Sequence, residues 1–77
     1  MSDPQAEKAI RDTMNDLAAG GMPRNSATVP EASWKRLIDD GASRADALER
    51  IYKEIGDMKQ RGELAVPDDP SENWQLT

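Results

Sequence analysis

The chain has 77 residues, a formal net charge of −5 at pH 7, and neither cysteine nor histidine. The absence of cysteine excludes disulfide frameworks and thiolate metal sites, and the absence of histidine removes the commonest metal ligand and the usual acid–base group near neutral pH. Phenylalanine is also absent and large aliphatic residues are few, a composition that borders on that of disordered chains. We therefore expect at most one small domain, with an ordered centre and flexible ends.

A first helix is predicted over residues 4–19. Asp3 can act as its N-cap, Pro4 suits the first helical position, and Gly20-Gly21 supplies the stop. Its apolar stripe is thin and contains few large side chains: Ala6, Ile10, Met14 and Leu17. Such a helix needs a neighbour to be stable.

A second helix is predicted over residues 29–40. Thr28 and Glu31 match a capping box, in which the threonine is the N-cap and the glutamate reaches back to its amide, and Gly41 ends the helix. Trp34 falls at an inward position, where a tryptophan is more often part of the core than of a binding surface. The sequence therefore predicts Trp34 as the anchor of the fold.

A third helix is predicted over residues 44–61, between a weak capping box that begins at Ser43 and a stop at Gly62. Five of its apolar side chains recur at spacings of three and four residues: Leu48, Ile51, Tyr52, Ile55 and Met58. This stripe predicts packing against the first two helices. A short coiled-coil seam with a partner helix or with a second copy of the chain is the alternative.

Charged residues of the third helix are spaced for ion pairing within the helix. Pairs four residues apart with the acid first are Asp46–Arg50, Glu49–Lys53 and Asp57–Arg61. Each such pair stabilises a helix by about 0.2–0.5 kcal/mol. The helix is thus predicted to neutralise its own cations, which disfavours nucleic acid as a partner because phosphate binding needs free lysine and arginine.

Residues 65–77 carry three acids and no base, and Pro67 and Pro70 favour an extended path. The sequence therefore predicts an extended acidic tail, with Trp74 and Leu76 near its end. In one interpretation Trp74 folds back as a lid over the helices. In the other, Trp74 and Leu76 form an exposed motif whose aromatic ring fills a pocket of a partner.

Catalysis and metal binding are both disfavoured. Ser33 and Lys35 lie two residues apart, on different faces of a helix, and cannot form a nucleophile–base pair there. Asp39-Asp40 and the acids of the tail are expected on solvated surfaces, where burial does not raise the pKa of a carboxyl group. The tail also lacks the residue spacing of a calcium-binding loop. We therefore expect no enzymatic activity, no catalytic residue, no metal and no cofactor.

The beginning of the chain contains neither the basic segment nor the apolar run of a signal peptide. No run of about 18 apolar residues is present, so no membrane-spanning segment is expected. These features predict a cytoplasmic protein without membrane contact.

The order of features across residues 25–61 resembles that of ribbon–helix–helix proteins. In that family a short strand precedes a helix that begins near Pro-Glu, a turn of the Gly-x-Ser type follows, and a second helix completes the unit. Val29-Pro30-Glu31, Gly41-Ala42-Ser43 and the helix of residues 43–61 fall in matching places. The resemblance implies a dimer whose paired strands enter the DNA major groove. The groove-facing positions would be one of two alternating sets: Asn25, Ala27 and Val29, or Arg24, Ser26 and Thr28. In antitoxins of this fold an acidic C-terminal segment wraps the toxin. The acidic residues 65–77 are compatible with that role.

The sequence as a whole predicts an all-α, three-helix domain over residues 1–64, with a flexible N-terminus and an acidic tail over residues 65–77. Its expected function is that of a small protein-binding regulator, either an inhibitor or an antitoxin-like factor. Alternatives are a dimeric ribbon–helix–helix DNA-binding repressor with an extra N-terminal helix, and a structural subunit of a larger assembly. The residues predicted to contact a protein partner are Trp74, Leu76, Asp68, Asp69, Glu72, Tyr52 and Met58.

Overall fold

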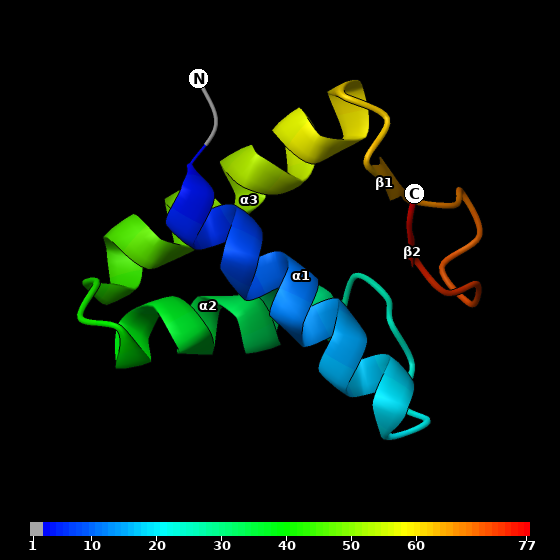
Figure 1. Ribbon diagram of the computed structural model, residues 1–77, viewed down its shortest axis with the longest axis horizontal. Coiled ribbons are helices and arrows are strands. Elements are labelled where there is room, and N and C mark those ends of the chain that lie inside the picture. Colours follow the sequence, from blue (N-terminus) through cyan, green and yellow to red (C-terminus); the bar gives the residue numbers. More distant parts are fainter. Residues whose placement is uncertain (1–2) are drawn as a thin grey trace.

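The computed structural model describes residues 3–77 and contains three helices and one small pair of strands (Figure 1). The helices are α1 (Pro4–Ala19), α2 (Val29–Asp39) and α3 (Arg44–Gln60), and the strands are β1 (Leu64–Ala65) and β2 (Gln75–Leu76). The strands pair antiparallel, with Leu64 opposite Leu76. The predicted small and mostly helical domain is confirmed, whereas the strands were not predicted. Residues 1–2, where the sequence predicts a flexible N-terminus, lie outside the described residues.

α1 packs against both other helices, and the core lies where the three meet. In Figure 1, α2 and α3 diverge from the turn that joins them, and α1 lies across the pair. Each helix contributes large buried side chains: Ile10 and Met14 from α1, Val29 and Leu37 from α2, and Ile51 and Met58 from α3. Because each apolar face is narrow, the helices stabilise one another. Within residues 3–77 no helix combines the length and the apolar character needed to cross a bilayer.

Most of the predicted helix ends are confirmed. The Asp3 side chain accepts the backbone N–H of Ala6 at 3.2 Å, and the Ser43 hydroxyl accepts that of Asp46 at 3.3 Å. All three helices end in a left-handed glycine: Gly21, Gly41 and Gly62, with φ of 67°, 107° and 75°. The amide after each glycine then bonds to a carbonyl five residues back, the pattern of a Schellman motif.

The predicted capping box at Thr28 is wrong. Thr28 has a helical backbone conformation, and its side chain makes no capping bond to α2. Its hydroxyl instead donates to the carbonyl of Pro23 at 2.8 Å and accepts the N–H of Asn25 at 2.9 Å. Residues 25–28 therefore form a turn that leads into α2, and residues 24–29 contain no strand. The ribbon–helix–helix alternative needs a strand there, so the observed architecture differs from it.

α3 buries a different face from the one predicted. Ile51, Ile55 and Met58 are buried, but Leu48 and Tyr52 are exposed, and Ala47 and Glu54 are buried in their place. Glu54 is 1% exposed, and both of its carboxylate oxygens accept hydrogen bonds that compensate for its burial. One accepts the guanidinium of Arg61 at 2.8 Å, and the other accepts the backbone N–H of Asp3 at 3.1 Å. A fully bonded carboxylate can occupy a packed helix face at acceptable cost.

Arg50 of α3 and Arg61, the C-cap of this helix, pair mainly with acids outside the predicted register. Arg50 donates to both carboxylate oxygens of Asp3, at 2.7 and 3.0 Å, while its distance to Asp46 is 4.0 Å. Arg61 pairs with Glu54 and with acids outside α3 rather than with Asp57. Among residues 3–77, the ion pairs four apart do not include Glu49–Lys53. Of the three predicted pairs, Asp46–Arg50 is present, whereas Glu49–Lys53 and Asp57–Arg61 are not among the ion pairs of residues 3–77, so the helix neutralises its own cations only in part.

The structure differs from the predicted role of Trp34 and agrees with one of the two interpretations of Trp74. Trp34 is only partly buried, at the edge of the core, and its indole N–H donates to the carbonyl of Arg44 at 3.0 Å. Trp74 is 5% exposed and belongs to the core. The tail folds back through β2, and the amide of Trp74 donates to the carbonyl of Arg24 at 2.6 Å. The predicted extended tail is therefore a packed segment in this structure, as in the lid interpretation.

Candidate functional site

An exposed apolar surface lies on one side of the α2–α3 hairpin. Trp34 and Ile38 follow one another by one turn on α2, and Leu48 and Tyr52 do the same on α3. The Trp34 indole donates to the backbone carbonyl of Arg44, one turn before Leu48, so Trp34 lies against the start of the stripe that Leu48 and Tyr52 continue. We call these four residues (Trp34, Ile38, Leu48 and Tyr52) the α2–α3 apolar face.

Two side chains of this face are unusually accessible for their size. Leu48 is 43% exposed and Tyr52 is 57% exposed. The other large exposed apolar side chain within residues 3–77 is Met22, at 54%, which follows the end of α1. Fully burying a side chain of this kind is worth about 1.5–3 kcal/mol, so covering Leu48 and Tyr52 together could contribute measurably to binding.

The α2 side of the face is hollowed. A shallow pocket of about 290 Å³ is lined by Trp34, Lys35, Ile38, Asp39 and Arg44. The indole and the isoleucine supply apolar walls, and charged groups of both signs stand at the rim. A hollow of this composition suits an apolar side chain that projects from a partner with polar neighbours.

Several charged residues beside the face have no ion-pair partner within residues 3–77. They carry both signs: Arg44, Glu49, Lys53 and Lys59. All four are exposed on α3. The exposed surface of α3 is therefore neither uniformly basic nor uniformly acidic.

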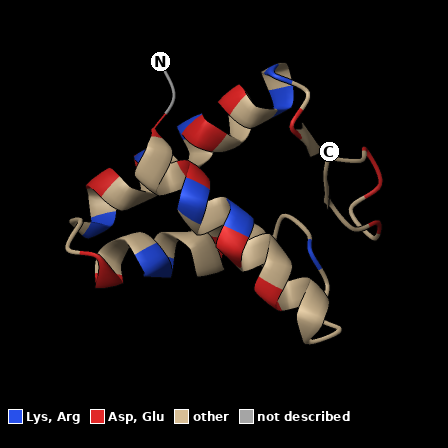
Figure 2. Cartoon of the chain, viewed as in Figure 1, with Lys and Arg blue, Asp and Glu red and all other residues tan. Residues whose placement is uncertain are grey.

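The predicted acidic contact residues lie on the loop that connects β1 to β2. Asp68, Asp69 and Glu72 are exposed there, and Figure 2 shows only acidic charges on this loop, whereas both signs alternate along α3. Asp69 accepts the backbone N–H and the hydroxyl of Ser71 at 2.9 and 2.8 Å, and these bonds lower the pKa of the Asp69 carboxyl group. The loop is thus ordered by its own bonds and carries a local negative charge.

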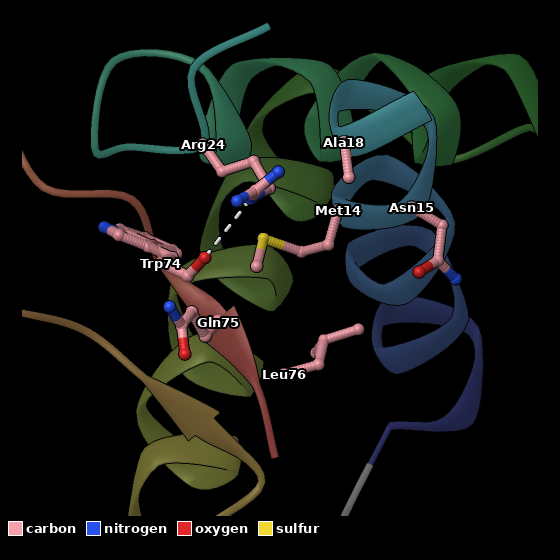
Figure 3. Close-up of a pocket in the computed structure, with 7 residues that line it drawn as sticks. All are labelled: Met14, Asn15, Ala18, Arg24, Trp74, Gln75 and Leu76. Atoms are coloured by element: carbon pink, nitrogen blue, oxygen red, sulfur yellow. Dashed lines mark hydrogen bonds between the residues drawn. The ribbon is translucent and has the colours of Figure 1, made fainter. Parts of the chain in front are cut away.

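Three other predicted contact residues are covered by their own chain. Met58 is fully buried, Trp74 is nearly so, and Leu76 is partly buried against the core. Figure 3 shows the surroundings of Trp74 and Leu76, where the Met14 side chain extends from α1 toward β2 and Arg24 donates to the carbonyl of Trp74 at 3.3 Å. A hollow of about 290 Å³ remains between α1 and this segment. Contact of the Trp74 ring with a partner would require the segment to detach.

Sequence reasoning listed Tyr52 as a contact residue but missed the three other members of the α2–α3 apolar face: Trp34, Ile38 and Leu48. It assigned Leu48 and Trp34 to the core because their spacing fits a buried stripe. For Leu48 the sequence contains one indication, because Ala47 starts a second stripe at the same helical spacing, but periodicity alone does not choose between the two stripes.

Within residues 3–77 no group of three or more acidic side chains is arranged to hold a metal ion. Comparison of the chain with protein-family models, with curated proteins and with solved structures finds no match. The functional argument therefore rests on the exposed surfaces described above.

Proposed function

We propose that the chain is a small protein-binding regulator that recognises its partner through the α2–α3 apolar face. The observation that carries this proposal is the exposure of Leu48 and Tyr52 one turn apart, on a helix whose opposite face already supplies the core. Side chains of this size in register on a helix are typical of helix-mediated protein recognition. The acidic loop of Asp68, Asp69 and Glu72 would add electrostatic selectivity for a basic segment of the partner.

A protein suits this surface better than nucleic acid. Binding to a phosphate backbone needs clustered and uncompensated lysine and arginine. Arg50 and Arg61 are engaged by carboxylates, and Glu49 stands among the remaining cations of α3. Mixed charges around an apolar centre are instead the ordinary composition of a protein–protein interface.

A photo-crosslinking experiment tests the proposal. A photoreactive phenylalanine analogue at Tyr52 is expected to capture one protein in the host cell, and the Leu48→Ser change in the same chain is expected to reduce that adduct strongly. The same analogue at Met22 is the matched control, because Met22 is equally exposed but lies away from the face. Equal capture at the two positions, or an adduct insensitive to Leu48→Ser, would contradict the proposal.

A further inference from the structure

The exposed surface of α3 contains a glycine that the helix itself does not require. Gly56 lies within the helix, and a side chain added there would meet nothing within 4 Å. Glycine is one of the poorest helix formers, so an exposed glycine at this position weakens α3. Because Gly56 has no side chain, a large group of another molecule can lie close to the backbone of α3 at this position.

A large side chain stands beside this flat site on the same surface. Tyr52 precedes Gly56 by four residues, so the two lie on one stripe of the helix. Both are exposed. A tyrosine ring from an apposed helix would fit over Gly56, just as Tyr52 would fit over a glycine of that helix.

The charged residues beside this stripe and the stripe itself are spaced symmetrically about position 54. Tyr52 and Gly56 lie two residues either side of Glu54, and Glu49 and Lys59 lie five residues either side of it. In an antiparallel pair of identical helices whose two-fold axis passes the exposed side of α3 at the level of residue 54, one register therefore sets Tyr52 against Gly56 and Glu49 against Lys59. Each residue of a pair lies the same number of residues from the axis, so at a rise of about 1.5 Å per residue the two lie at the same height along the paired helices. Neither Glu49 nor Lys59 has an ion-pair partner within residues 3–77.

From this coincidence we infer that α3 pairs antiparallel with α3 of a second copy of the chain. The inference rests on the proposed function, because it names the partner of the Tyr52 side of the α2–α3 apolar face. The tyrosine of each copy covers the glycine of the other, and two symmetric ion pairs fix the register. The oppositely charged pairs also disfavour the parallel arrangement, which would set like charges against each other.

The expected affinity is modest. α3 has 17 residues and is about 25 Å long, so one helix pair buries less area than a standard protein interface. We expect a dissociation constant of about 10–100 µM and rapid exchange.

Sedimentation analysis of a charge-exchange series tests the register. The variants are Glu49→Lys, Lys59→Glu and the double exchange, studied from about 5 to 500 µM at low salt, where exposed ion pairs are screened least. Each single change sets like charges against each other twice per dimer and is expected to weaken pairing by about tenfold. The double exchange restores both ion pairs with the original net charge and is expected to return the affinity to within about threefold of the parent chain.

Two further variants separate the register from general effects of charge and surface. Lys53→Glu makes the same charge change as Lys59→Glu, on the same helix but away from the paired positions, and should leave dimerisation nearly unchanged. Gly56→Leu adds apolar surface but fills the site of the tyrosine ring, so it should weaken dimerisation while favouring the helix.

A parent chain that stays monomeric at 500 µM, or a double exchange no tighter than the single variants, would overturn the inference. A monomeric chain that still crosslinks from position 52 to a different protein would also overturn it, while leaving the proposed function in place.

Discussion

Ser33 and Ser43 have opposite roles although both lie in or beside a helix. The Ser33 hydroxyl is buried without a hydrogen-bond partner, whereas the Ser43 hydroxyl caps α3. We expect Ser33→Ala to raise the free energy of unfolding by about 1 kcal/mol, because it removes an unbonded hydroxyl and favours the helix. Ser43→Ala should lower it by about 1 kcal/mol through loss of the cap. Urea denaturation measures both, and a loss of stability in Ser33→Ala would contradict the first assignment.

Glu54 is a buried carboxylate that joins α3 to the start of α1. Its two oxygens bind Arg61 and the amide of Asp3, which lies 51 residues away in the chain. Glu54→Gln keeps the size but removes the charge, and we expect a loss of about 1–3 kcal/mol in the free energy of unfolding. The loss stays below that of a fully buried pair because Arg61 is partly exposed and keeps other acids. Glu49→Gln on the exposed side is the control, with an expected change within about 0.5 kcal/mol; equal effects of the two changes would refute this role.

At the scale of the elements, the returning segment around β2 completes the core. Trp74 brings the large buried ring, while Trp34 stands at the edge. Trp74→Ala is therefore expected to cost about 3–5 kcal/mol and to unfold a substantial part of the population, because a domain of this size has little stability to lose. Trp34→Ala should cost clearly less. Chemical denaturation followed by circular dichroism compares the two, and a larger loss in Trp34→Ala would restore the role that the sequence suggests for it.

The helix bounds were predictable because their signals are local. Asp3, Ser43 and the three terminal glycines act on amides and carbonyls within a few residues of themselves. The buried face of α3 was not predictable from periodicity, since Ala47 and Leu48 start two stripes of equal spacing. The choice between them depends on Glu54, whose partner at Asp3 is distant in sequence. The candidate site was found only in part for the same reason.

The position of Trp74 also depends on a distant contact. Its amide bonds to the carbonyl of Arg24, in the turn between α1 and α2, and nothing near Trp74 in the sequence indicates that partner. The acids of the tail together with Pro67 and Pro70 favoured an extended path. The segment instead folds back onto the helices, where the Trp74 ring completes their core.

At the scale of the whole molecule, charged groups join Asp3 and the segment that follows α3 to the helices. Asp3 binds Arg50, and Glu63, which follows α3, binds Arg61 and lies 3.4 Å from Arg11. The radius of gyration is 11.6 Å, close to the value of about 11.5 Å expected for a folded domain of this length. The compact shape therefore includes the C-terminal segment, and these carboxylates hold the start of α1 and the segment directly after α3.

These carboxylates make stability depend on acid pH. The hydrogen bond from Arg50 lowers the pKa of the Asp3 carboxyl group, and that from Arg61 lowers the pKa of Glu63. A carboxyl group with a lowered pKa in the folded state stabilises the fold at any pH above its unfolded value, and this contribution is lost as the pH falls through the folded value. We therefore expect a nearly constant free energy of unfolding from pH 7 to about 5 and a progressive decrease below that.

The Asp3→Asn variant isolates one of these contributions. It should be less stable than the parent chain at pH 7, because the charged bonds to Arg50 are lost. The difference should shrink below about pH 4, as Asp3 of the parent chain becomes protonated first in the unfolded state and then, at its lowered pKa, in the folded state. Asp68→Asn is the matched control, since Asp68 is exposed and makes no ion pair within residues 3–77. Urea unfolding at a series of pH values measures the difference. A gap between Asp3→Asn and the parent chain that stays constant from pH 7 to 3 would show that Asp3 acts through its neutral hydrogen bond to Ala6 and not through its charge.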